Sequence, residues 1–317
     1  MRVMLITNPF ATTTSSAGRD RLYESLSARH SVELVATTRR GHATELGALA
    51  AGTFDAVVVN GGDGSVNEVV NGMLGAPDRT DRPAAGDLPA LGVIPGGNAN
   101  VFARALGIDP DPVRAAAQLA TGLDRGTRRP VSLGHTLGRW FLFTAGTGLD
   151  ATVIRRMEQL RAAGRRVTDL RYVTTALGTF LSPAHPSPTF TVDMPGRTVE
   201  GVRFGFVSNT SPWTYLGPLA LRTNPGTDLD HGLGVAALTS LAVVPTLVLA
   251  GRLLTGSRNP RSAHLVREDD VPTVRFTGTS PADVQIDGDY VGRHSRLDFG
   301  CVPGALDVIA PAPASFR

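Results

Sequence analysis

The stretch VVNGGDGSVNEVVNG, residues 58–72, places an apolar run, a glycine-rich turn and a helical pattern one directly after another. Glycines let a backbone approach a ligand closely, and the N-terminus of a helix offers amide groups that bind anions. This order is typical of a seat for nucleotide phosphates. The turn also holds Asp63, whose negative charge is explained if a divalent cation bridges it to phosphate oxygens. The simpler alternative is a tight turn in which Asp63 caps the following helix.

The same alternation extends outward from this stretch through the first 125 residues. Strands that alternate with helices predict a mostly parallel sheet with helices on both faces, and ligands bind such sheets at the carboxyl ends of the strands. Three of these ends carry turn-forming polar residues: TNP (7–9), NGGDG (60–64) and PGGNAN (95–100). The predicted strands are 2–7, 31–37, 55–60 and 90–95, and the predicted helices are 18–29, 42–51, 66–74 and 101–106.

Beyond Asp124 the periodicity changes to short, nearly alternating segments separated by Gly, Pro and Asp-Gly turns. This pattern predicts an antiparallel, β-rich sandwich or barrel-like domain. The expected organisation is therefore an α/β nucleotide-binding domain over residues 1–127 and a β-rich domain over residues 128–302. Residues 303–317 are expected to form a C-terminal strand and tail that could return to the first domain.

Composition excludes several kinds of chemistry. All 31 basic residues are arginine, so the lysine of a P-loop, of a protein kinase or of a Schiff base is absent. The net charge of +3 is too small to indicate a nucleic-acid partner. Cys301 is the single cysteine, which excludes an intrachain disulfide and suits a reducing, cytoplasmic compartment. The seven histidines show no spacing typical of metal ligands.

Two segments are relevant to whether the chain spans or contacts a membrane. Residues 233–250 carry no charge over eighteen positions, but Pro245 and several small polar residues favour a strand at 234–238 and a helix at 245–254 over a membrane span. The helical pattern at 154–172 places most of its arginines off the apolar stripe. That basic face is either simply solvated or contacts an anionic leaflet.

Taken together, GGDGSVNEVVNG, IPGGNANVFARALG, ITNPF, TTRRGHATEL, AGTGLDATVI and IDGDYVG resemble the diacylglycerol kinase and sphingosine kinase family of lipid kinases, especially its bacterial members. The resemblance extends over almost the whole chain, and the long GGDG motif is its most specific part. Three positions depart from the family: Val101 and His231 each replace a usual aspartate, and Asp289 replaces a glutamate. Because imidazole is a poor ligand for Mg²⁺, the family's structural magnesium near His231 is expected to be weak or absent.

The resemblance implies transfer of the γ-phosphate of ATP, with Mg²⁺, to a hydroxyl of a diacylglycerol-like or other amphiphilic lipid. It implies a cytoplasmic protein that reaches its lipid substrate at the inner face of the membrane, and it leaves a homodimer open. It makes Asp287 the general base and Asp63 a second catalytic residue, with Asp63 and Glu68 near the metal of MgATP. The positions that it places at the nucleotide are Asn8, Pro9, Thr37, Gly61, Gly62, Asp63, Gly64, Ser65, Asn67, Glu68, Gly97, Asn98 and Asn100.

Alternatives remain. An NAD kinase shares the GGDG element and a related two-domain plan, although NEVVNG and PGGNANVFAR favour the lipid branch. A non-catalytic lipid- or nucleotide-binding module would explain Val101 and His231, but the presence of Asp63 and Asp287 argues against it. Asp287 itself could simply form the turn of a hairpin, since Asp-Gly is a strong hairpin dipeptide.

Overall fold

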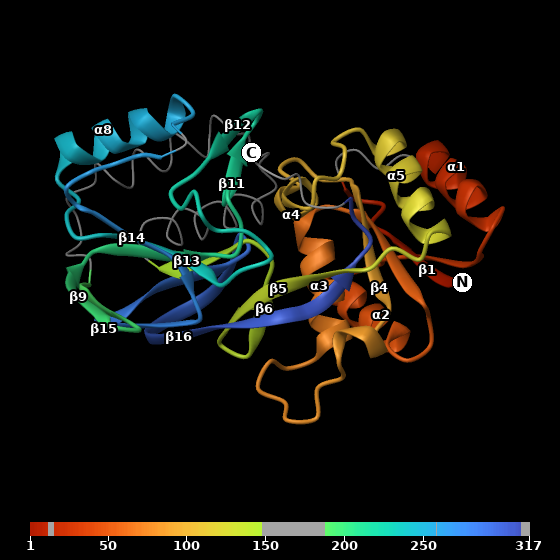
Figure 1. Ribbon diagram of the computed structural model, residues 1–317, viewed down its shortest axis with the longest axis horizontal. Coiled ribbons are helices and arrows are strands. Elements are labelled where there is room, and N and C mark those ends of the chain that lie inside the picture. The colour runs from red at the N-terminus through yellow and green to blue at the C-terminus, as the bar shows by residue number, and fades with distance from the viewer. Residues whose placement is uncertain (12–15, 148–187, 258, 312–317) are drawn as a thin grey trace. The chain divides into compact units, whose positions relative to one another are not determined.

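The computed structural model describes residues 1–11, 16–147, 188–257 and 259–311, which form two compact units (Figure 1). The N-terminal unit consists of residues 1–133, 138–140 and the chain from Val302 onward, and the β-rich unit consists of residues 134–137 and 141–301. The domain boundaries proposed at 127 and 302 stay a prediction. The arginine-rich pattern at 154–172 lies outside the described residues, as does most of AGTGLDATVI.

The N-terminal unit is built on a parallel sheet in which β1 lies between β2 and β3, and β3 pairs with β4. Thr7 pairs with Ala36 and with Asn60, and Gly61 pairs with Pro95, so all four strands end at one edge. The predicted alternation of strands and helices is confirmed. The strands of this sheet are β1 (Arg2–Thr7), β2 (Ser31–Ala36), β3 (Ala56–Gly61) and β4 (Ala90–Pro95), and Val308 of β16 pairs in parallel with Leu91.

Helices cover both faces of this sheet, as the pattern predicted. Leu22 and Leu119, from α1 and α5, pack in one cluster with Leu5 and Val58 of the strands. On the other face, α2 and α3 contact β1 and β3. The helices are α1 (Ser16–Ser27), α2 (His42–Ala50), α3 (Asp63–Leu74), α4 (Val101–Ala105) and α5 (Pro112–Asp124), with a 3-10 turn η1 (Ala85–Asp87).

Two glycines set the distance between α2 and α3. A Cβ atom on Gly47 would lie 2.4 Å from the carbonyl oxygen of Val69, and one on Gly72 would lie 2.0 Å from that of Thr44. Since real side chains do not approach backbone this closely, only glycine allows the two helices to pack at this separation.

The β-rich unit is antiparallel, as predicted. Its core contains Phe190, Val235, Phe276 and Val284, which come from three strands that lie far apart in the sequence. Its strands are β7 (Thr144–Thr147), β8 (Phe190–Met194), β9 (Arg197–Val202), β10 (Phe204–Ser208), β11 (Thr214–Leu216), β12 (Leu219–Leu221), β13 (Leu233–Leu238), β14 (Leu265–Val271) and β15 (Thr273–Ile286). Three further strands contribute residues to both units: β5 (Arg129–Thr136), β6 (Arg139–Phe141) and β16 (Asp289–Val308).

The uncharged stretch at 233–250 divides as predicted into the strand β13 and the helix α8 (Val243–Leu254). Pro245 lies in the first turn of α8, where a missing amide hydrogen costs nothing. Among the described residues, no helix is long and apolar enough to cross a membrane.

Candidate functional site

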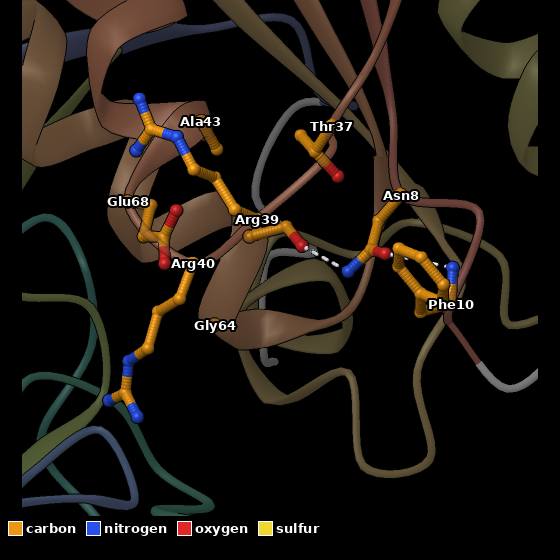
Figure 2. A pocket seen from close by; sticks show the side chains of 9 residues that line it. Asn8, Phe10, Thr37, Arg39, Arg40, Ala43, Gly64 and Glu68 are labelled. Atoms are coloured by element: carbon orange, nitrogen blue, oxygen red, sulfur yellow. Dashed lines mark hydrogen bonds between the residues drawn. The ribbon is translucent and has the colours of Figure 1, made fainter.

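A cavity of about 310 Å³ opens at the carboxyl edge of the parallel sheet (Figure 2). The loops after β1 and β2 and the first turns of α3 surround it, so the strand ends that carry the polar motifs do form one site. Five of the predicted nucleotide-binding residues line it. The lining residues are Asn8, Phe10, Thr37, Arg39, Arg40, Ala43, Gly64, Ser65 and Glu68.

The two glycine loops that follow β3 and β4 touch each other backbone to backbone. A Cβ atom on Gly97 would lie 2.8 Å from the Cα atom of Gly62, and one on Gly62 would lie 3.3 Å from the Cα atom of Gly97. Neither glycine has a positive φ angle, so close approach is what requires glycine here. Gly64 differs, because a Cβ atom there would meet nothing within 4 Å. The open space at Gly64 belongs to the cavity and is available to a ligand.

Asn8 fixes the loop after β1 against α3. Its Nδ2 donates to the Ser65 hydroxyl at 3.0 Å, and its Oδ1 accepts from the backbone amide of Phe10 at 3.0 Å (Figure 2). Its own amide donates to the carbonyl of Asn60 at the end of β3. Asn8 therefore joins two strand ends and shapes one wall of the cavity, whereas Pro9 beside it is exposed.

Charged side chains surround the other wall. Arg39 and Arg40 extend in different directions (Figure 2). Arg39 forms a salt bridge with Glu45 at 2.7 Å. This hydrogen bond lowers the pKa of Glu45. Both carboxylate oxygens of Glu68 accept from the backbone amide of Gly41 at 3.0 Å, so Glu68 holds the start of α2 at the cavity. A contact between Glu68 and the metal of MgATP stays a prediction.

Asp63 links the two glycine loops. Its Oδ2 accepts from the amide of Val101 at 3.0 Å and its Oδ1 from that of Phe102 at 3.2 Å. The alternative that Asp63 caps its own helix is therefore wrong: it caps α4, while the N-cap of α3 is Gly62. Burial raises the pKa of Asp63, and the two amides and the charge of Arg104 oppose that shift. The first amides of α4 thus supply partial positive charge beside this carboxylate. A catalytic or metal-binding role of Asp63 stays a prediction.

The three other asparagines that were predicted to contact the nucleotide differ in their hydrogen bonds and their exposure. Asn100 accepts from the Gly97 amide at 2.9 Å and donates to the Gly97 carbonyl at 2.8 Å, which closes the second glycine loop. Asn67 is only 4% exposed and donates to the carbonyl of Trp140 at 3.1 Å. Asn98 is exposed on the loop. Nucleotide contact by these three side chains stays a prediction, as it does for Gly61.

Four cavity residues were not among the positions predicted individually to contact the nucleotide: Phe10, Arg39, Arg40 and Ala43. Phe10 is 82% exposed, so its ring is accessible at the edge of the cavity that it lines. The signal for the arginines was present, since the pair follows directly after a predicted strand that ends at the ligand-binding edge.

Asp287 lies in the β-rich unit, at the turn between β15 and β16. The predicted Asp-Gly turn is confirmed, and both Asp287 (φ 47°) and Gly288 (φ 82°) have positive φ angles. The carboxylate accepts three backbone amides, from Leu142 at 2.6 Å and from Phe143 and Thr144 at 3.0 Å each. The position of this carboxylate is thus fixed by the backbone that leads into β7.

His231 is exposed, and its Nδ1 lies 2.7 Å from an oxygen of Asp228. This hydrogen bond, and then the charge of Asp228, raises the pKa of His231. Within the described ranges no group of three or more His, Cys, Asp or Glu side chains is arranged to hold a metal ion.

The chain was compared with known proteins. The family model of the diacylglycerol kinase catalytic domain matches residues 2–135. A diacylglycerol kinase of Bacillus subtilis (strain 168) is 41% identical over 114 residues, which is 36% of this chain and 34% of that relative. A Pseudomonas aeruginosa (strain UCBPP-PA14) protein named "Probable lipid kinase YegS-like" is 31% identical over 272 residues, or 84% of this chain and 79% of the relative. The chain belongs to the diacylglycerol kinase family of lipid kinases. The family predicted from the GGDG and PGGNAN motifs is therefore confirmed.

The fold of this family member also matches solved structures. A diacylglycerol kinase from Bacillus anthracis strain Sterne matches with a TM-score of 0.71 at 20% identity, covering 98% of this chain and 97% of the other. An NAD kinase from Archaeoglobus fulgidus in complex with ATP matches with a TM-score of 0.52 at 12% identity, covering 98% and 93%. Identities this low show the fold alone. They confirm the predicted combination of an α/β unit and a β-rich unit.

Proposed function

We propose that this protein transfers the γ-phosphate of ATP to a hydroxyl group of a diacylglycerol-like or other amphiphilic lipid. The observation that carries the proposal is the cavity at the carboxyl edge of the parallel sheet, where Gly64 leaves open space at the N-terminus of α3. A helix N-terminus favours a phosphate group through its amide hydrogens and its dipole. Membership of the family supports the lipid class of the acceptor.

The residues at the cavity fit a nucleotide. The chain has no lysine, but Arg39 and Arg40 both line the cavity and bring positive charge to the place where the phosphates would bind. Thr37 and Ser65 offer hydroxyl groups, and Phe10 offers an exposed ring face on which a base could stack. In this proposal the nucleotide binds in the cavity, and its phosphates lie at Gly64.

A magnesium ion held mainly by protein carboxylates does not fit the described residues. Among the described residues, no three His, Cys, Asp or Glu side chains are grouped to hold a metal ion, and each oxygen of Asp63 and Glu68 already accepts one backbone amide. Magnesium prefers to keep several waters and to bind phosphate oxygens with one or two carboxylates. We therefore derive no catalytic step from a metal held by these side chains.

We propose Asp287 as the residue that accepts the proton of the lipid hydroxyl. A carboxylate fixed by three backbone amides keeps one geometry, and a general base must be held in position to contribute. The same hydrogen bonds are also what a purely structural anchor would make. Replacement of Asp287 therefore lowers activity strongly only if it is the base, whereas it lowers stability in either role.

The test of the phosphate seat compares two glycines. Gly64→Leu adds a side chain where the cavity is open, and Gly86→Leu adds one at η1, where a Cβ atom likewise meets nothing within 4 Å. We expect Gly64→Leu to weaken ATP binding in calorimetry by about tenfold or more, equivalent to ~1.4 kcal/mol. Gly86→Leu should bind ATP as the parent does. Equal affinity in both folded variants would remove the phosphate seat from this cavity.

The acceptor is tested separately. Labelled ATP is offered with a panel of diacylglycerol, other amphiphilic alcohols and NAD. Transfer of label to a lipid supports the proposal. Transfer to NAD alone would show a nucleotide kinase on the shared fold, and binding of ATP without any transfer would show a non-catalytic module.

A further inference from the structure

The helix α8 presents its apolar residues outward. Val243, Val244, Leu247, Val248 and Leu254 are 45–72% exposed, whereas Leu249 is its one buried residue. The exposed set recurs at intervals of three, four and seven residues, so it forms a continuous stripe on one face. A surface helix in water normally carries polar residues on that face. The reversed pattern indicates that something other than water covers α8.

The stretch of sequence that contains α8 carries charges of one sign only. Residues 231–267 contain no Asp or Glu, and they contain four arginines, at 252, 258, 261 and 267. Arg252 and Arg261 are exposed, and together with Val244 and Val248 they line a depression of about 280 Å³. A side-chain nitrogen of Arg252 donates to the carbonyl oxygen of Arg261, which holds the helix against the segment before β14. The apolar stripe therefore lies beside a positively charged rim.

This combination fits a lipid surface. α8 has 12 residues, which span about 18 Å and fall short of the roughly 30 Å hydrocarbon core of a bilayer, so it cannot cross. A short helix with an apolar face and arginines at its edge lies in the plane of the interface and is attracted to anionic lipids. A second copy of the chain fits less well, because it would bring one arginine rim against another.

We infer that the outward face of α8 docks the β-rich unit on anionic membranes. The purpose of this docking rests on the proposed function, because a kinase whose acceptor lies in a bilayer must reach that bilayer. The physical claim does not depend on catalysis, since it concerns only Val244, Leu247, Val248 and the neighbouring arginines.

The experiment measures co-sedimentation of the protein with vesicles, without ATP and without any acceptor lipid. The vesicles consist of phosphatidylcholine, with or without phosphatidylglycerol. The test variant is Val244→Asp with Val248→Asp. Val113→Asp is the matched control, because Val113 is 71% exposed and Val244 is 72% exposed, and each is the second residue of its helix. A third variant, Val244→Thr, keeps the shape of the side chain and removes only apolar character.

The parent and Val113→Asp should bind the anionic vesicles more tightly than the neutral ones, and high salt should weaken that binding. The double aspartate variant should lose about tenfold or more in affinity, because two apolar side chains are replaced by charges that anionic lipid repels. The affinity of Val244→Thr for the anionic vesicles should lie between that of the parent and that of the double aspartate variant. Binding of the double variant equal to that of the parent would overturn the inference. So would a parent that binds no vesicles and forms a dimer that the double variant lacks.

The outcomes separate this inference from the proposed function. If the parent binds vesicles through α8 but phosphorylates no lipid, the docking surface stands and the lipid kinase activity does not. If it phosphorylates a short-chain, soluble acceptor and binds no vesicles, the activity stands and the docking surface does not.

Discussion

Replacement of Asp287 by asparagine changes one oxygen of the carboxylate into an amide group and leaves the size of the side chain unchanged. In the folded protein, Oδ1 accepts from Phe143 and Thr144, and Oδ2 accepts from Leu142 at 2.6 Å. An asparagine that keeps its oxygen toward Phe143 and Thr144 must turn its NH₂ group toward the amide of Leu142. Two donors then face each other, and the amide of Leu142 loses its acceptor.

The cost follows from that single lost acceptor. A buried donor left without a partner costs about 1–3 kcal/mol. For a unit of this size such a loss lowers the melting temperature by roughly 2–12 °C. If Asp287 is also the general base, kcat should fall by at least about 100-fold, because asparagine cannot accept the proton.

The assay measures the melting temperature and kcat of Asp287→Asn beside those of Asp298→Asn. Asp298→Asn is the same chemical change in the same unit, but Asp298 is exposed and its partners are Arg275 and Arg296, so its loss should cost no more than about 1 kcal/mol for each ion pair. A lowered melting temperature with near-parental kcat would make Asp287 a structural anchor, and the base would then have to be sought elsewhere. An unchanged melting temperature would refute the hydrogen-bond reasoning itself.

The other two predictions concern titrating groups. The imidazole of His231 should titrate above its ordinary value of 6.5 in an NMR measurement, and Asp228→Asn should lower that midpoint. Because the pKa is raised in the folded state, the stabilising contribution is complete below pH 6.5 and is lost as the pH rises through the folded-state pKa. The thiol of Cys301, whose pKa burial and then Asp270 raise to about 11, should react with iodoacetamide at pH 8 about 100-fold more slowly in the folded protein than in the unfolded chain. Titration of His231 at or below 6.5, or equal rates for Cys301, would contradict these assignments.

Local patterns in the sequence were sufficient to predict the frame of the site. Strands that alternate with helices predict a parallel sheet, and parallel strands that follow one another end at the same edge. The sequence alone therefore placed Asn8, Thr37 and Gly64 near one another. The division of residues 233–250 into a strand and a helix could also be predicted from neighbouring residues alone, because Pro245 suits the first turn of a helix.

Contacts between distant residues could not be predicted in this way. Asp63 accepts from amides 38 and 39 positions away, and Asp287 from amides more than 140 positions away, and no periodicity in the chain indicates such partners. The strand before Arg39 and Arg40 indicated that they lie near the ligand-binding edge, but whether their side chains and that of Phe10 line the cavity could not be predicted. The direction of a side chain on a loop depends on the path of the loop, which composition does not specify.

The glycines between α2 and α3 act as a spacer for a site that they do not line. One helix follows the loop that carries Arg39 and Arg40, and the other carries Gly64, Ser65 and Glu68. Any side chain at Gly47 or Gly72 must push these helices apart, and the mouth of the cavity would widen with them. Gly47 and Gly72 thus influence the width of the cavity although they do not line it. A screen for altered ligand preference should therefore sample these two positions as well as the cavity wall.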